Sequence, residues 1–306
     1  MSTLPQPTLD SVLQQTRNET GLPASELRIL MTHITGLDRV NLVTKGNQEL
    51  PMDQLSAFKS LAAKRQQGEP IAYLVQHKEF YSRPFFVDPR VLIPRPETEE
   101  LVEHALGFLQ SKSTENLLTR VLDIGCGSGA IAVSLALENP ILEITATDIS
   151  ADALWVAQHN ANELGAKNIR FVQSDLFENL LNQVPPLAFD LICSNPPYIE
   201  RGDEHLVQGD LRFEPQKALT DGGDGLRFYR EIARHSPSLL RAGGGVLVEH
   251  GHKQQEAVKA LFAQAPYVQV QGLPDLAGTP RFVFARIENE RFIPTSSTLQ
   301  GCSNSS

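Results

Sequence analysis

A glycine-rich segment, Asp123-Ile124-Gly125-Cys126-Gly127-Ser128-Gly129-Ala130, has the residue types that hold a nucleotide-like ligand. A short apolar run precedes it and a run of small residues follows, which predicts a strand, a tight loop and a helix. Glycines let the backbone approach a ligand closely, and the start of a helix presents unpaired N–H groups. We therefore predict a cofactor-binding loop here, with a tight turn that binds nothing as the alternative.

An acidic residue, Asp148, ends the next β-rich segment. A carboxylate at that place can accept hydrogen bonds from both ribose hydroxyls, which indicates an adenosine-type cofactor. The pattern serves NAD and S-adenosylmethionine equally well, so it does not name the chemistry. Asp175 follows a third strand and is predicted either to approach the adenine amino group or to cap a helix.

The segment Ser194-Asn195-Pro196-Pro197-Tyr198 ends a fourth predicted strand. Two prolines stop the strand, remove two N–H donors and fix the neighbouring carbonyls. A planar amino group can then donate one hydrogen bond to the Asn195 side chain and another to a carbonyl near the prolines, while Tyr198 stacks on it. An amide nitrogen is a poor nucleophile, so it must be oriented in this way before it attacks. We predict that residues 195–198 orient such a group.

Covalent catalysis and metal binding are not indicated. Cys126, Cys193 and Cys302 are odd in number and far apart, which fits neither a disulfide framework nor a zinc site and favours a reducing compartment. The Cys126 thiol is explained by the need for a small side chain. His250 and His252 flank a glycine, as turn residues do. We assign no nucleophile and no metal.

Strands and helices alternate through the second part of the chain. The expected strands are 120–124, 143–148, 169–174, 189–194, 246–249 and 281–287, and the expected helices are 130–137, 151–164 and 254–263. This alternation predicts an α/β fold with an open, mainly parallel sheet covered on both faces. The glycine loop and the double proline then lie on the same edge of the sheet.

The first eighty or so residues are expected to form a small helical unit that presents a surface. Apolar residues recur at helical spacing within 8–19, 23–36 and 51–68, with Pro or Gly at several boundaries. Residues 80–94 are expected to form two short β segments around Asp88-Pro89-Arg90. A polar, aperiodic tail from residue 288 to 306 is expected to be disordered.

Composition limits the kinds of partner. Of the 306 residues 41% are hydrophobic, and 27 basic against 36 acidic residues give a net charge of -9. This disfavours a large basic face for duplex DNA. The polar N-terminus and the lack of a long apolar run predict a cytoplasmic protein without a membrane segment.

Several segments together resemble the peptide-chain release factor glutamine methyltransferases, the HemK or PrmC group. They are Gly68–Leu74, Leu92–Glu99, the loop 123–129, Asp148, residues 195–198 and Arg212–Pro215. The resemblance runs from about residue 20 to 287. The Asn-Pro-Pro-Tyr element alone is less specific, because amino-methyltransferases of DNA use a similar element.

The resemblance implies a class I S-adenosylmethionine methyltransferase fold: Rossmann-like, with a seven-stranded mixed sheet whose last strand is antiparallel. It implies a helical substrate-docking domain (1–79), a β-hairpin connector (80–94) and a methyltransferase domain (95–287). The implied reaction is methylation of the side-chain amide nitrogen of the glutamine in the Gly-Gly-Gln tip of class 1 release factors. The expected protein is a monomer that binds no nucleic acid stably.

The resemblance also implies residue roles. The methionine part of the cofactor would be bound by Gly125, Cys126, Gly127, Ser128 and Gly129. Asp148 would bind the ribose, Leu176 would lie at the adenine, and Asn195 would face the cofactor as well. The substrate glutamine would be held by Asn195, Pro196, Pro197 and Tyr198. Thr98 and Glu99 would close over the cofactor.

Other functions remain open. A ribosomal-protein glutamine methyltransferase has the same motifs but tends to carry Pro-Arg-Ser where this chain has Arg95-Pro96. A DNA amino-methyltransferase needs a basic cleft, which the composition does not supply. A nicotinamide-dependent oxidoreductase explains the loop and Asp148 but leaves the double proline without a role.

Overall fold

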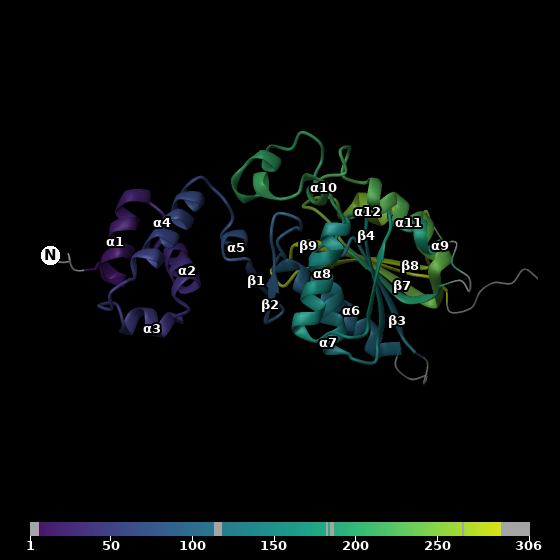
Figure 1. The fold of residues 1–306 in the computed structure, drawn as a ribbon. Coiled ribbons are helices and arrows are strands. Elements are labelled where there is room, and N and C mark those ends of the chain that lie inside the picture. The colour runs from purple at the N-terminus through teal and green to yellow at the C-terminus, as the bar shows by residue number, and fades with distance from the viewer. Residues whose placement is uncertain (1–5, 113–117, 182, 184–186, 265, 289–306) are drawn as a thin grey trace, which may run out of the picture.

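The computed structural model describes residues 6–112, 118–181, 183, 187–264 and 266–288. A group of short helices lies at one end, and a sheet flanked by helices forms the rest (Figure 1). The tail expected to be disordered lies outside the described residues, except for Glu288. Within the described part of the chain, no helix is both long and apolar enough to cross a membrane.

Five helices, the N-terminal bundle, enclose a core of their own. They are α1 (Leu9–Thr20), α2 (Ala24–Thr35), α3 (Arg39–Thr44), α4 (Met52–Gln66) and α5 (Ile71–Leu74). Thr8 accepts a hydrogen bond from the backbone N–H of Ser11 at the start of α1, and the left-handed Gly21 and Gly36 follow the ends of α1 and α2. Leu30, Met31 and Phe58 are fully buried between the helices. The three predicted helices are confirmed.

The β-hairpin lies a few residues earlier than predicted. Strands β1 (His77–Phe80) and β2 (Arg83–Phe86) pair antiparallel, and the turn between them is Tyr81-Ser82, both with positive φ. A two-residue turn of that conformation matches the twist of paired strands. The prediction of strands around 88–90 is wrong, because Asp88 accepts a hydrogen bond from the Arg90 N–H at 3.0 Å and closes a local turn.

A seven-stranded mixed sheet forms the main body of the protein. Its strands are β3 (Arg120–Ile124), β4 (Glu143–Asp148), β5 (Ile169–Gln173), β6 (Phe189–Ser194), β7 (Leu240–Glu249), β8 (Gln269–Pro274) and β9 (Pro280–Arg286). The order is β5-β4-β3-β6-β7-β9-β8, and β9 is antiparallel to both neighbours. The six strands predicted from the pattern are confirmed, and β8 is the seventh. The predicted fold class is confirmed.

Helices cover both faces of this sheet. One face packs against α6 (Glu97–Lys112), α7 (Ala130–Glu138) and α8 (Ala151–Leu164). The other packs against α9 (Glu178–Leu181), α11 (Arg227–Leu239) and α12 (Gln255–Ala263). Between β6 and α11 the chain leaves the sheet and forms η1 (Glu204–Val207), η2 (Gly209–Phe213) and α10 (Gln216–Leu219), which lie above the carboxyl ends of the strands (Figure 1).

The sheet order places two predicted site segments side by side. The order in which successive strands are added to the sheet reverses at β3, because β4 lies on one side of it and β6 on the other. Ligands bind in the crevice at such a switch point. Ile124 pairs with Ser194 in the β3–β6 register, and the Ser194 hydroxyl donates to the Ile124 carbonyl at 2.8 Å. The glycine loop and the double proline therefore start from adjacent positions.

Candidate active site

The glycine loop bends tightly from β3 into α7. The backbone N–H groups of Gly125 and Cys126 both donate to the Thr147 carbonyl, at 2.8 and 2.9 Å. Gly129 has φ +81° and immediately precedes α7. A Cβ at this position would lie 3.1 Å from the Cβ of Ala157 on α8, so both the conformation and the close helix contact favour glycine.

Asp148 holds this loop from the neighbouring strand. Its carboxylate accepts the backbone N–H of Gly127 at 3.0 Å and that of Ser150 at 2.9 Å. Burial raises the pKa of this carboxyl, and the backbone hydrogen bonds oppose the shift. Each carboxylate oxygen keeps a further lone pair for a ligand hydroxyl.

A cavity of about 300 Å³ opens between these segments. Among the predicted cofactor residues, those that line it are Gly125, Gly127, Asp148, Leu176 and Asn195. The lining is mostly apolar, with Asp148 and Asp175 as its acidic side chains. An apolar recess with a few polar groups suits an adenosine-type ligand, because the base needs flat contacts and the ribose needs an acceptor. The residues that line this cavity therefore fit an adenosine-type cofactor.

Cys126, Ser128 and Gly129 shape the loop and are not among the residues that line the cavity. Burial raises the pKa of the Cys126 thiol well above its usual range, so it is a neutral, small side chain. The Ser128 carbonyl accepts a hydrogen bond from the side chain of Asn160, and the Gly129 N–H donates to the Cys126 carbonyl at 2.7 Å. Their contribution to the cavity is indirect.

Leu176 lies in a left-handed conformation, with φ 47°, at the edge of the cavity. Residues other than glycine adopt that region at an energetic cost, and such positions cluster at functional sites. The neighbouring Asp175 is exposed and also lines the cavity. The cavity wall is therefore built partly from a strained backbone segment after β5.

Asn160 joins the glycine loop to the β-hairpin. This buried α8 side chain accepts the Phe86 N–H at 2.7 Å and donates to the carbonyls of Phe86 and Ser128, at 3.0 and 2.9 Å. We expect Asn160→Ala to lower the free energy of unfolding by about 2 kcal/mol, because buried backbone groups lose their partners. Urea denaturation measures this.

Asn162 lies on the same helix and is exposed, so Asn162→Ala is the matched control. It should change the free energy of unfolding by no more than about 0.5 kcal/mol. Equal stabilities of the two variants would contradict the role assigned to Asn160.

A second cavity, of about 600 Å³, lies on the other side of Asn195. We call it the substrate cavity and the first one the cofactor cavity. Leu92, Asn195, Pro196 and Ala218 line both, while Tyr198 lines only the substrate cavity and Pro197 only the cofactor cavity. Asn195 and Pro196 therefore stand where the two cavities meet.

Asn195 is held by a chain of hydrogen bonds. Its Nδ2 donates to the Thr98 hydroxyl at 3.0 Å, and that hydroxyl is 2.7 Å from Oε2 of Glu249. The Nδ2 group is thereby engaged, so Asn195 presents its Oδ1 as an acceptor. Thr98 is thus a partner of Asn195 and does not line the cofactor cavity. Glu99 accepts the N–H of Tyr81 in the hairpin at 2.9 Å, so neither residue closes over that cavity as predicted.

Tyr198 follows the double proline and is partly buried. Its backbone carbonyl accepts Nε2 of Gln254 at 3.0 Å. Burial, followed by the charge of Glu249, raises the pKa of Tyr198 to about 12, so the phenol is neutral. The ring provides an aromatic wall for the substrate cavity.

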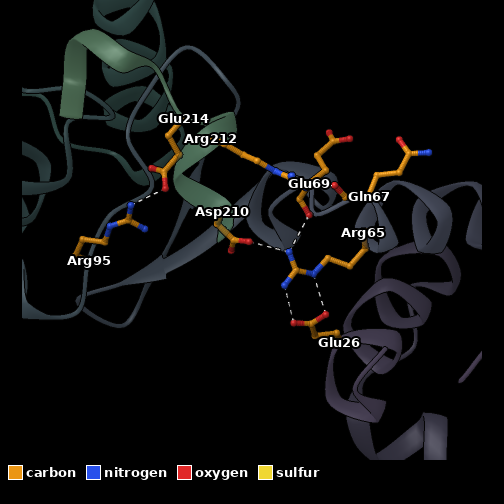
Figure 2. Close-up of polar contacts among 8 residues, drawn as sticks. All are labelled: Glu26, Arg65, Gln67, Glu69, Arg95, Asp210, Arg212 and Glu214. Atoms are coloured by element: carbon orange, nitrogen blue, oxygen red, sulfur yellow. Dashed lines mark hydrogen bonds and ion pairs between the residues drawn. The ribbon is translucent and has the colours of Figure 1, made fainter. Parts of the chain in front are cut away.

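The segment 204–214 bridges the sheet and the N-terminal bundle. Arg65, at the end of α4, pairs with Glu26 on α2 and with Asp210 of this segment at 2.8 Å (Figure 2). Arg212 donates to the Gln67 carbonyl. These contacts come from the Arg-Phe-Glu-Pro segment and its neighbours, and Asp210 also lines the substrate cavity.

Glu214 ties the same segment to the connector. It is buried, accepts the Ile93 N–H at 3.0 Å and pairs with Arg95 at 2.6 Å (Figure 2). A buried carboxylate needs such partners to offset its lost hydration. Arg95 and Glu214 both line the substrate cavity, so the Pro-Arg-Pro and Arg-Phe-Glu-Pro segments meet there.

Some lining residues were not predicted. In the cofactor cavity they include Arg90, Val91, Ser150 and Phe228, and in the substrate cavity they include His205, Glu249 and Arg281. Glu249 ends β7 at the same sheet edge as the glycine loop, and an acidic residue at a predicted strand end was the available signal. His205 and Phe228 lie outside the sheet and carry no such signal.

Two family models match the chain. One, described as "PrmC N-terminal domain", covers residues 11–75, and the other, "Methyltransferase small domain", covers residues 100–226. The first spans most of the N-terminal bundle. The second spans β3 to β6, the glycine loop and Asn195.

Curated relatives are similar over most of their length. A protein of Bordetella pertussis is 47% identical, covering 89% of this chain and 97% of its own. One of Neisseria gonorrhoeae is 45% identical (87% and 94%), and one of Escherichia coli is 42% identical (86% and 92%). All three are named release factor glutamine methyltransferase.

Solved structures share the fold. The N-terminal domain of human METTL16 in complex with SAH has a TM-score of 0.52 at 17% identity, covering 90% of this chain and 98% of that one. The human METTL16 catalytic domain in complex with an RNA hairpin has a TM-score of 0.54 at 14% identity, covering 87% and 91%. At these identities the likeness is one of fold.

Proposed function

The chain belongs to the release factor glutamine methyltransferases, and from that premise we propose how its two cavities carry out the reaction. Its cofactor is S-adenosylmethionine, and its substrate is a glutamine of a release factor. The observation that carries the proposal is the position of Asn195 and Pro196, which line both cavities. A substrate amide held there faces the cofactor cavity.

Asn195 and the backbone beside the prolines orient the substrate nitrogen. When bound, the cofactor supplies an electrophilic methyl group on a sulfonium sulfur. Oδ1 of Asn195 accepts one amide proton, because its Nδ2 is already engaged by Thr98. A carbonyl near the prolines accepts the other, which directs the nitrogen lone pair toward the cofactor cavity. Were the methyl group to pass from the sulfonium sulfur to this nitrogen, the nitrogen would release one proton to water.

Asp148 and the loop glycines hold the nucleoside part of the cofactor. The Asp148 carboxylate accepts the ribose hydroxyls, while Gly125 and Gly127 allow the methionine part to approach the backbone. Cys126, Ser128 and Gly129 keep the loop in shape, and Leu176 lies against the base. The roles of the lining residues rest on the cavity described above, and those of the other three rest on the conformation and hydrogen bonds of the loop.

The substrate is proposed to be the Gly-Gly-Gln tip of class 1 release factors. An exposed loop of small residues can enter the substrate cavity, which the segment 204–214 and Tyr198 border. The net charge of -9 disfavours a DNA base as the natural substrate. The Arg95-Pro96 pair favours release factors over a ribosomal protein.

We propose that the N-terminal bundle docks the release factor and that residues 1–79, 80–94 and 95–287 are the working units. The bundle has its own core and contacts the substrate cavity wall through Asp210. A cytoplasmic monomer is proposed as well, and the free, buried thiols of Cys126 and Cys193 fit a reducing compartment.

A competition experiment tests the substrate class. The full chain is incubated with methyl-labelled S-adenosylmethionine and equal amounts of release factors, ribosomal proteins and DNA. We expect label in the release factors alone. Label that appears only in ribosomal protein or only in DNA would overturn the substrate assignment.

A further inference from the structure

In the proposed function one end of the Asn195 side-chain amide faces the substrate. The orientation of this amide therefore decides whether Asn195 accepts or donates a hydrogen bond there. An asparagine turned by half a rotation would present Nδ2 and repel the amide protons of the substrate. The chain of hydrogen bonds through Thr98 to Glu249 has a direction. That direction fixes which atom Asn195 presents.

We propose that Thr98 and Glu249 are positioning residues that set the Asn195 amide for catalysis, and that they do so only while Glu249 is ionised. The proposal rests on the function given above. An ionised Glu249 is an acceptor only, so the Thr98 hydroxyl donates to it. The hydroxyl oxygen is then free to accept Nδ2 of Asn195, and Oδ1 faces the substrate.

Protonation of Glu249 removes this direction. A carboxylic acid can donate to the Thr98 hydroxyl, which then donates in turn to Oδ1 of Asn195. The amide flips and presents Nδ2 where the substrate needs an acceptor. Glu249 is therefore a proton-dependent switch that acts on Asn195 through Thr98.

The hydrogen-bonded residues Thr98 and Glu249 are buried, so the direction of their hydrogen bonds determines how Asn195 is oriented. Thr98 is 5% exposed and Glu249 is 1% exposed. Water does not readily replace a lost hydrogen-bond partner at such a site, so each hydroxyl or carboxyl proton has few acceptors available. Thr98 lies in the first turn of α6 and Glu249 at the end of β7, which fixes the distance between them.

Other charged groups face Glu249 from the surrounding elements. Arg281 of β9 and Arg95, which precedes α6, favour its ionised form, and Glu97 of α6 opposes it. Tyr198 and His250 are neutral neighbours, because burial raises the pKa of Tyr198 and lowers that of His250. Burial outweighs the favourable contacts and raises the pKa of Glu249 to about 7. Ionisation thus changes within the physiological range.

The test measures single-turnover methyl transfer to a release factor from pH 6 to 8, at saturating S-adenosylmethionine. The wild-type rate should rise with pH through about 7, as Glu249 loses its proton. Glu249→Gln should make the rate flat across this range, since the amide does not titrate. Persistence of the same pH dependence in Glu249→Gln would overturn the proposal.

Thr98→Val and Thr98→Ser form a matched pair. The first removes the hydroxyl at constant shape and should slow methyl transfer by about 10- to 100-fold, with cofactor affinity unchanged by calorimetry. The second keeps the hydroxyl and should restore the rate to within about threefold of wild type. Thr98→Val with the wild-type rate, or equal losses in both variants, would contradict the role of the hydroxyl.

Thr145→Val controls for the substitution itself. Thr145 is buried in β4 and is not among the residues that line either cavity. It should leave the rate and its pH dependence unchanged. If the wild type fails to methylate any release factor glutamine, the proposed function fails; if it succeeds and the Thr98 and Glu249 variants behave like it, only this inference fails.

Discussion

Asn195→Ala is expected to reduce methyl transfer by about 10²- to 10³-fold while cofactor affinity stays close to wild type. In the proposed mechanism the Asn195 oxygen faces the substrate amide, and no other residue in the described lining shared by the two cavities offers a side-chain acceptor. Leu92, Pro196 and Ala218, which share its position between the cavities, have no side-chain acceptor. Single-turnover kinetics on a release factor measures the rate.

Calorimetry separates the two effects of this substitution. The cofactor cavity keeps Asp148, Gly125 and Gly127 in Asn195→Ala, so the affinity for S-adenosylmethionine should survive. Parallel loss of affinity and rate would mean that Asn195 mainly holds the cofactor. An unchanged rate would remove it from the mechanism.

Asp148→Ala is expected to weaken cofactor binding by about a hundredfold. The carboxylate is the acidic side chain at the end of β4, and it also ties the glycine loop through the Gly127 N–H. Its loss should remove the proposed hydrogen bonds to the ribose and the observed one that holds the loop. Titration calorimetry measures the affinity, and thermal unfolding without cofactor measures how much of the loss comes from the fold.

Asp152→Ala is the matched control for Asp148→Ala. Asp152 is an exposed carboxylate in the first turn of α8 and is not among the cavity-lining residues. Its removal changes the net charge equally and should leave the affinity nearly unchanged. If both variants bound the cofactor with wild-type affinity, the ribose assignment would be wrong.

The fold was largely predictable where local signals are strong. Proline or glycine marks the ends of several N-terminal helices, apolar residues mark the buried strands β3 and β6, and β-branched residues mark β4. Strand β8 escapes pattern analysis because it is an edge strand with few buried residues and a glycine, Gly272. Helix α11 is amphipathic but contains Pro237, which argues against a helix in isolation.

The hairpin shows a different limit. Asp88-Pro89-Arg90 has strong turn residues, whereas Tyr81-Ser82 does not, yet the strands pair across Tyr81-Ser82. Tertiary packing decides this, because Phe80 and Phe85 are fully buried and Asn160 binds Phe86 at the end of β2. Only the folded chain brings α8 to that strand.

The functional residues show the same difference between local signals and tertiary contacts. Within a short segment, such as the glycine loop or residues 195–198, the residue types by themselves indicate the chemistry. The contact between Thr98 and Glu249 has no such local signal, since they lie 151 positions apart and meet only when α6 packs beside β7. The pairing of Glu214 with Arg95 likewise forms only when the segment 204–214 folds back over residues that are more than a hundred positions earlier in the chain.

Tandem mass spectrometry of a release factor tests the central claim most directly, that Asn195 presents a substrate glutamine nitrogen to the cofactor cavity. The release factor is treated with S-adenosylmethionine and either the wild-type or the Asn195→Ala chain, then digested and sequenced. The account predicts one methyl group on the side-chain nitrogen of the Gly-Gly-Gln glutamine with the wild type and almost none with the variant. Methylation of a different residue, or equal methylation by both chains, would contradict it.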